Sequence, residues 1–192
     1  MKKIWIIVVS VTVLFLLSLT TAVISGYNSL VDLDESTSYS YTLIDARLEE
    51  RHNWITSAVS TISGLIAEEQ AIFDLITSAR TAAASGDMEA MIAADEELAE
   101  VVRDIIIIIE DNPELISADA YNGLLIDIGA LESALFVARK DYNDSVRKYN
   151  ADVRKFPKVI LASLFGFDRE KDYWEKSPGV EILPAIDFGE DE

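Results

Sequence analysis

IWIIVVSVTVLFLLSLTTAVI, residues 4–24, is the long uncharged apolar run of this chain. At about 1.5 Å per helical residue, a run of this length reaches about 31 Å, close to the hydrocarbon thickness of a bilayer. Fourteen of its residues are Ile, Val, Leu or Phe, each of which favours insertion by about 0.3–0.6 kcal/mol. Trp5 and Tyr27 lie at its two ends, where aromatic side chains prefer the bilayer interfaces. The run predicts a transmembrane helix over residues 4–24 within an anchor segment of residues 1–26.

A cleaved signal peptide is the competing interpretation of this run. Its apolar core is longer than the usual stretch of about 7–15 residues and no Ala-x-Ala site follows it, which favours a retained anchor. The absence of cysteine excludes a lipid-modified cysteine anchor. Lys2 and Lys3 are the only charges before Asp32. The positive-inside rule therefore predicts a cell-membrane protein with a cytoplasmic N-terminus and an extracytoplasmic domain.

Residues 27–192 are strongly acidic. They carry 14 basic and 34 acidic residues, a net charge of −20 at neutral pH. Nucleic acid is therefore not expected as a partner, because binding it requires Lys and Arg to replace the phosphate counterions. Half of the chain is hydrophobic, and Pro113 is the only proline between Tyr27 and Phe156. This composition predicts one helical domain with a core of its own.

Apolar residues recur three and four positions apart through this domain, as in amphipathic helices. The pattern predicts four helices, at residues 27–52, 54–83, 87–111 and 117–155. Short connections join them near 52–54, at Ser85-Gly86-Asp87 and around Asn112-Pro113, where proline disfavours helix at the residue before it. Short connections favour an all-α fold, an antiparallel up-down four-helix bundle over residues 27–157. Sustained heptads are also compatible with an intermolecular coiled coil.

Four charged residues lie on or beside the predicted core faces. Glu69 occupies a core-facing position, and Arg80, Glu132 and Arg139 each lie one position from a core face. An unpaired buried carboxylate is costly, so Glu69 is expected to contact a cation or to take up a proton. The first interpretation is an ion-pair network that specifies helix register. The alternatives are a ligand or proton site inside the bundle, and simple exposure.

The sequence shows no recognisable catalytic constellation. His52 is the only histidine, so Glu49-x-x-His52 cannot complete a di-iron site, which needs two such motifs. Any Ser-His-Asp triad would have to use this one histidine. The sequence contains no thiol and no Gly-rich phosphate-binding loop. We therefore expect a non-enzyme with no catalytic residues, no metal, no cofactor and no small-molecule substrate.

Half of the domain's basic residues are concentrated in a short stretch near the end of the fourth predicted helix. They are Arg139, Lys140, Arg147, Lys148, Arg154, Lys155 and Lys158. In an up-down bundle this helix runs back toward the membrane, and an apolar stretch of residues 159–167 follows it. One hypothesis is a membrane-surface contact, made by Arg147, Lys148, Arg154, Lys155, Lys158, Phe165 and Phe167. The alternative is that residues 158–167 fold back and cap the base of the bundle, before an acidic tail that ends at residue 192.

The run from Ala138 to Asn150, ARKDYNDSVRKYN, followed by Phe156-Pro157 and Phe165-Gly166-Phe167, resembles the signature of the LemA family. Further matching positions occur in order along nearly the whole chain. They are Tyr27-Asn28, Leu30-Val31, Glu69, Ala79-Arg80, Glu132 and Ile186-Asp187-Phe188. Two departures lie close together: the family usually has two arginines at Arg51-His52, and Ile-Pro-Asn at Ile55-Thr56-Ser57. Without that proline, the first two predicted helices could be kinked or partly continuous.

The resemblance implies a single-pass membrane protein with a helical-bundle domain and no established enzymatic activity. One branch of the family is associated with forming magnetosome membranes, which favours membrane organisation. The expected function is a membrane scaffold whose partners are the lipid bilayer and either a second copy or another membrane protein. The alternative is an accessory subunit of a membrane protease or transporter.

Overall fold

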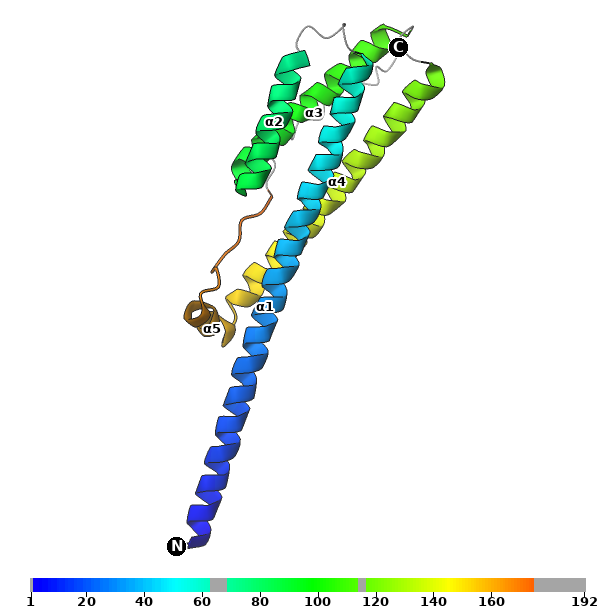
Figure 1. The fold of residues 1–192 in the computed structure, drawn as a ribbon. Coiled ribbons are helices and arrows are strands. Elements are labelled where there is room, and N and C mark those ends of the chain that lie inside the picture. The colour runs from blue at the N-terminus through cyan, green and yellow to red at the C-terminus, as the bar shows by residue number, and fades with distance from the viewer. Residues whose placement is uncertain (1, 63–68, 114–116, 175–192) are drawn as a thin grey trace, which may run out of the picture. The chain divides into compact units, whose positions relative to one another are not determined.

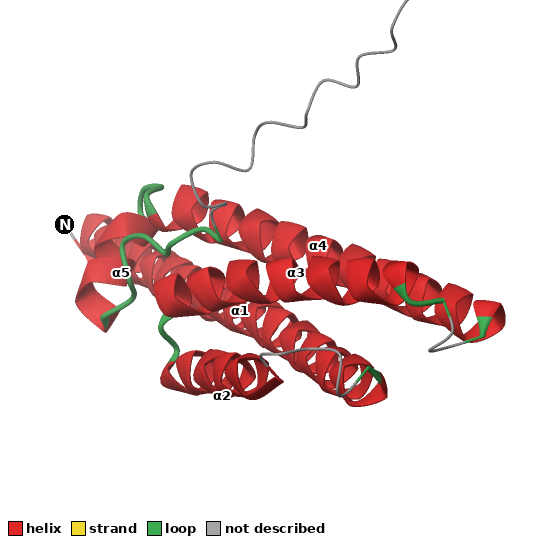
Figure 2. Cartoon of the chain, turned by 90° about the horizontal axis from the view of Figure 1, so that it is seen from above, coloured by secondary structure: helices red, strands yellow, loops and turns green. Residues whose placement is uncertain are grey.

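The computed structural model describes residues 2–62, 69–113 and 117–174, and all regular structure in these ranges is helical (Figures 1 and 2). The helices are α1 (Lys2–Thr61), α2 (Glu69–Ser85), α3 (Met88–Asp111), α4 (Ala118–Val153) and α5 (Lys158–Phe165). The all-α prediction is confirmed for the described ranges.

Helix α1 is a single uninterrupted helix of 60 residues. It contains both the apolar run 4–24 and the first helix predicted for the domain. The break predicted near residues 52–54 does not occur, so this prediction was wrong. Residues 27–63 contain no glycine or proline, and Arg51, His52 and Ile55 are buried along one side of α1. A continuous buried face without a helix breaker favours continuation of the helix to Thr61.

The two later breaks occur where the sequence predicts them. Helix α2 ends at Ser85, and Gly86 adopts a φ of 71°, a left-handed conformation that glycine tolerates best. Asp87 caps α3, since its carboxylate accepts a 3.0 Å hydrogen bond from the backbone N–H of Ala90. Helix α3 ends at Asp111, just before Asn112-Pro113. The neighbouring helices α2 and α3 pack against each other.

The chain divides into two compact units, each with its own buried cluster. In the unit made of residues 44–137 and 174–192, four helical segments contribute to one apolar core. Its buried residues are Ile55, Ala58, Val59, Ile62, Ile76, Ala79, Ala94, Leu98, Val102, Ile105, Ile109 and Ile128. The five consecutive isoleucines at 105–109 are largely covered, with Ile107 the exposed member. We call this part the helical unit.

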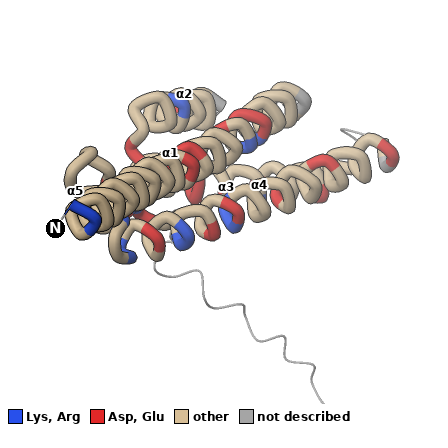
Figure 3. Tube along the Cα trace, turned by 90° about the horizontal axis from the view of Figure 1, so that it is seen from below, with Lys and Arg blue, Asp and Glu red and all other residues tan. Residues whose placement is uncertain are grey.

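The second unit comprises residues 1–43 and 138–173 and contains the apolar run. Its cluster joins Leu30 of α1, Tyr149 and Val153 of α4, and Leu161 and Ala162 of α5. We call this part the anchor unit. The side chains from Ile4 to Leu19 are all exposed, and among the described residues only the end of the run, at Val23, packs against this cluster (Figure 3 shows the segment without charge after Lys2 and Lys3).

Among the residues that the structure describes, two helices are long and apolar enough, by length and composition alone, to span a membrane. One is Lys2–Ser60 within α1, whose apolar window is entirely uncovered. The other is Asp119–Val153 within α4. Unlike the run in α1, α4 contributes buried residues such as Ile128 and Leu135 to the protein interior.

Candidate functional site

Arg51 of α1 is the centre of a buried polar cluster in the helical unit. Only 3% of its side chain is exposed, and its Nη1 donates a 2.6 Å hydrogen bond to Oδ1 of Asp95 on α3. Its Nε lies 3.1 Å from Oε1 of Glu132 on α4. Asp95 is also buried, whereas Glu132 is half-exposed. One guanidinium therefore links three helices through charge-assisted contacts.

His52 lies beside this cluster and is buried. Burial is the main cause that lowers the pKa of His52, and the nearby Glu49 carboxylate opposes this effect. The His52 Nδ1 lies 3.7 Å from Oε2 of Glu49. With its pKa below the ordinary value of 6.5, the imidazole is neutral at neutral pH and contributes a packed, uncharged ring.

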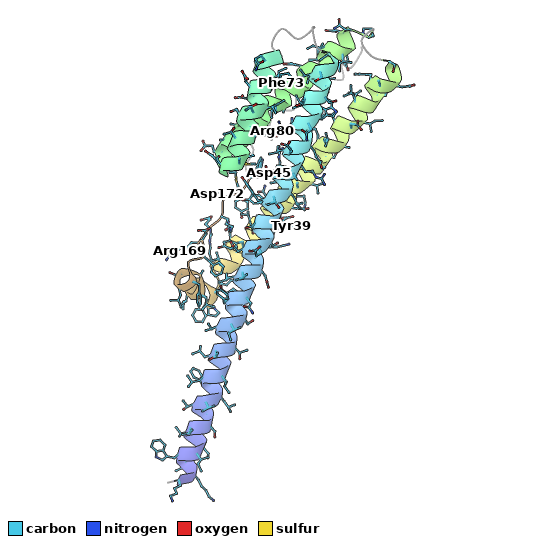
Figure 4. All side chains as sticks on the ribbon, viewed as in Figure 1. Tyr39, Asp45, Phe73, Arg80, Arg169 and Asp172 are labelled. Carbon is cyan, nitrogen blue, oxygen red and sulfur yellow. The ribbon has the colours of Figure 1, made fainter. Side chains whose placement is uncertain are left out.

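Arg80 of α2 pairs with α1 at the edge of the same unit (Figure 4). Its guanidinium donates to both carboxylate oxygens of Glu49, at 2.9 and 3.1 Å, and to Oδ1 of Asn53 at 3.0 Å. The hydrogen bond from Arg80 is the main cause that lowers the pKa of Glu49. Glu49 is thus engaged by Arg80, and the Glu49-x-x-His52 motif is part of an ion-pair arrangement. Within the described ranges, the structure contains no group of three acidic, His or Cys side chains placed to hold a metal.

The structure places three of the four charged residues singled out from the sequence, and they lie in separate environments. Glu132 contacts Arg51, and Arg80 contacts Glu49. Arg139 belongs to the anchor unit, and the side chain of Glu69 lies outside the described residues. The buried pair Arg51–Asp95 was missed. Its signal was present, because Arg51 extends the helical spacing of Ile44 and Leu48, both buried core residues.

In the anchor unit, three residues of the ARKDYNDSVRKYN run hold the segment that follows α5. The hydroxyls of Tyr142 and Tyr149 donate to the backbone carbonyls of Asp172 and Asp168, at 2.9 and 2.8 Å. The side-chain amide of Asn150 makes two 2.8 Å hydrogen bonds with the backbone of Lys171. Burial raises the pKa of both tyrosines to about 12. The signature run thus has a structural role that fixes residues 168–172 against α4.

The basic residues of the stretch from Lys140 to Lys158, which include those predicted to contact the membrane surface, are mostly paired with carboxylates of the same unit. The pairs are Lys140–Asp144 (2.9 Å), Arg147–Asp144 (3.1 Å), Arg154–Glu170 (2.6 Å), Lys155–Asp152 (2.6 Å) and Lys158–Asp152. Lys158 also donates to Oγ of Ser29 at 2.7 Å, and Lys148 is exposed. Hydrogen bonds from Lys155 and Lys158 lower the pKa of Asp152. Acidic and basic residues therefore lie close together along the end of α4 and in the residues that follow it (Figure 3).

Helix α5 packs one side against α1 at the end of the apolar run. Leu161 and Ala162 are buried, and the ring of Phe165 contacts Tyr27 edge-to-face at 4.9 Å between centroids. Phe167 lies 5.8 Å from the same ring and is partly buried. Of the two phenylalanines singled out from the sequence, only Phe165 is substantially exposed.

Other apolar side chains in and beside α5 are more exposed. Phe156 is 81% exposed, Ile160 57% and Leu164 72%. We call these three residues the α5 outer patch. The sequence identifies the apolar stretch but does not show which side of α5 is covered by α1.

The comparisons with known proteins agree with these features. The LemA family profile matches residues 40–188. Magnetosome protein MamQ 1 of Paramagnetospirillum magneticum is 22% identical over 196 residues, covering 88% of this chain and 72% of that protein. Magnetosome protein MamQ of Magnetospirillum gryphiswaldense is 22% identical over 209 residues, covering 94% and 77%. Because the family profile covers more than three quarters of the sequence, the chain belongs to the LemA family.

Proposed function

We propose that this protein is a non-enzymatic, single-pass membrane scaffold that presents a helical bundle outside the cytoplasm. The observation that carries the proposal is the uncovered apolar run, which continues without a break into the helix that builds the rest of the fold. A helix that is apolar on every side needs an apolar environment all round. Membership of the LemA family and similarity to proteins of the magnetosome support a membrane-associated role.

The proposed organisation is an anchor at residues 1–26, a bundle at 27–157 and an apolar segment with an acidic tail at 158–192. Two contacts support antiparallel packing of consecutive helices. Arg80 pairs with Glu49 across the α1–α2 connection, and the Tyr121 hydroxyl donates to Glu110 across the α3–α4 connection at 2.5 Å. We assign the membrane span to α1 alone, because Glu132 of α4 contacts the buried Arg51.

A face of α4 in the helical unit supports the scaffold role. Between Asn122 and Val137 its exposed residues are Asn122, Ile126, Gly129, Ala130, Ser133, Phe136 and Val137. Exposed Asp119 precedes them on the same face, and exposed Asp127 lies beside it. The residues of the face between Asn122 and Val137 carry no charge, in a domain whose net charge is −20, and Ile126 is 71% exposed. Exposed apolar faces of this kind mark contacts with other molecules. A second copy suits this uncharged stretch, since two acidic domains would otherwise repel each other.

The chain lacks cysteine, so single-cysteine variants give a clean test. In Ser133→Cys, two copies that pack through this α4 face form a disulfide-linked dimer on mild oxidation in native membranes. Ser78→Cys, at an exposed position of α2, is the matched control and stays monomeric. Equal dimer yields from the two variants would show random collisions and contradict the scaffold assignment.

The Ser133→Cys variant also distinguishes a scaffold from an accessory subunit. Labelling Ser133→Cys with a photoreactive maleimide and irradiating membranes should give a self-adduct for a scaffold. One stoichiometric adduct with a single foreign membrane protein, and no self-adduct, would instead identify the chain as an accessory subunit.

A further inference from the structure

We propose that helix α5 lies in the membrane interface beside the anchor, with Phe156, Ile160 and Leu164 inserted among the lipids. This inference rests on the proposed membrane anchoring by α1. It adds a second lipid-contacting element and assigns the contact to apolar side chains rather than to the neighbouring basic residues.

Helix α5 is held against α1 at the level where the apolar run ends. Val23 of α1 packs against the cluster that contains Leu161, and a Cβ placed on Gly26 would lie 2.6 Å from Leu161 Cδ1. Gly26 follows the apolar run by two residues, about 3 Å along a helix. A helix packed at this level lies at the boundary of headgroups and acyl chains, where interfacial helices bury their apolar side to about 5–10 Å.

Helix α5 is apolar on both sides. Lys158 and Ser163 are its only polar residues. Leu161 and Ala162 are covered by the chain itself, whereas Ile160 and Leu164 point away from the core and are exposed. Short helices that are apolar all round are buried in proteins or in lipid. Because α5 lies beside the apolar run, we assign lipid as the partner that covers its exposed side.

The basic residues at the start of α5 are already paired with acidic residues. Arg154, Lys155 and Lys158 each have a carboxylate partner within the anchor unit. Paired charges add little attraction to an anionic surface, and that surface repels the acidic domain. The contact should therefore depend on apolar insertion and should persist in zwitterionic lipid and in high salt.

The test uses the full-length chain reconstituted in phosphatidylcholine vesicles, with one cysteine at a time labelled with the fluorophore NBD. Ile160→Cys and Leu164→Cys report on the α5 outer patch. Tyr39→Cys is the aqueous control, an exposed position of α1 (Figure 4) that lies 12 residues beyond Tyr27. Leu14→Cys, in the middle of the apolar run, is the lipid control.

The proposal predicts that doxyl-labelled acyl chains quench the probes at 160 and 164, and that iodide quenches them several-fold less than the probe at 39. Iodide quenching equal to that at 39 would overturn the proposal. Quenching by neither agent would also overturn it and would show that protein covers the patch. Lipid quenching that needs phosphatidylglycerol or low salt would assign the contact to the basic residues instead. Failure of lipid quenching at position 14 would overturn the anchor itself, so the two failures are distinguishable.

Discussion

At the residue scale, the buried Arg51 guanidinium is the contact on which the helical unit depends most. It is held between Asp95 and Glu132 with almost no solvent around it. A buried charge is tolerated when it is paired, and removing one partner leaves the other uncompensated. The exposed Arg80–Glu49 pair is geometrically similar but surrounded by water, so it contributes much less.

Arg51→Met is expected to lower the free energy of unfolding by about 3–5 kcal/mol, because the buried Asp95 carboxylate loses its partner. The double variant Arg51→Met/Asp95→Leu should recover part of this loss. Urea unfolding of the full chain in detergent micelles measures both, in a background with Trp5 and Trp174 replaced by Phe so that the fluorescence reports Trp54 next to the core.

Arg80→Met is the matched control, and it should cost less than about 1 kcal/mol. Equal losses for Arg51→Met and Arg80→Met would show that the Arg51 cluster is not buried as the structure has it.

His52 should make stability depend on pH in a defined window. Its pKa is lowered from 6.5 in the folded chain, chiefly by burial, so the unfolded chain binds the proton more readily. The contribution of His52 to the free energy of unfolding is therefore fully present above about pH 6.5. It is lost as the pH falls below that value toward the lower pKa of the folded chain. Unfolding midpoints between about pH 8 and 5 should decline for the natural chain. The decline should be smaller for His52→Gln, and an unchanged decline would assign the effect to carboxylates.

The sequence could show Arg51 at a core-facing position, but its partners required three-dimensional register. Asp95 is 44 residues away, and helical periodicity gives the face of each residue without the level at which two helices meet. The same limit explains why Arg80 was grouped with Glu132 when its partner is Glu49. Ion pairs between helices depend on how the helices pack, which helical periodicity does not give.

At the scale of elements, Gly26 sets how closely α5 approaches α1. The space that its missing side chain leaves is occupied by Leu161, so the two helices meet at short distance beside the end of the apolar run. Glycine in a helix interior costs about 0.5–1 kcal/mol relative to alanine, and here close packing offsets that cost.

Gly26→Leu should destabilise the anchor unit by about 1–3 kcal/mol, since the added side chain overpacks the contact with Leu161. Gly26→Ala should cost less, because its Cβ meets only the movable end of the Leu161 side chain. Thermal unfolding in micelles measures both. Gly123→Ala in α4, where a Cβ meets no atom within 4 Å, is the control and should leave stability unchanged or slightly raised. A loss no larger for Gly26→Leu than for Gly123→Ala would contradict the close approach of α5.

Helix ends were predictable where a local breaker exists. Gly86 and Asn112-Pro113 provide one, and α2 and α3 end beside them. The break predicted near 52–54 has no glycine or proline to end the helix, and α1 continues through it. The position of α5 could not be predicted, because an apolar helix gives no periodic signal for which side is covered.

At the scale of the whole molecule, the account depends on the apolar run being retained and placed in the bilayer. The uncovered surface of this run, the LemA family and the magnetosome relatives all support that placement. The orientation rests on Lys2 and Lys3 and the positive-inside rule. One experiment tests both the retention of the apolar run in the bilayer and the orientation of the domain.

That experiment is mass spectrometry of the chain from alkaline-washed membranes of intact spheroplasts, before and after protease is added outside. The account predicts that the untreated chain stays in the membrane fraction and retains residues 1–26. Added protease should remove the domain and leave the N-terminal segment protected. A chain that begins after residue 26 and is washed from the membrane would contradict the anchor. A domain digested only after lysis would reverse the topology.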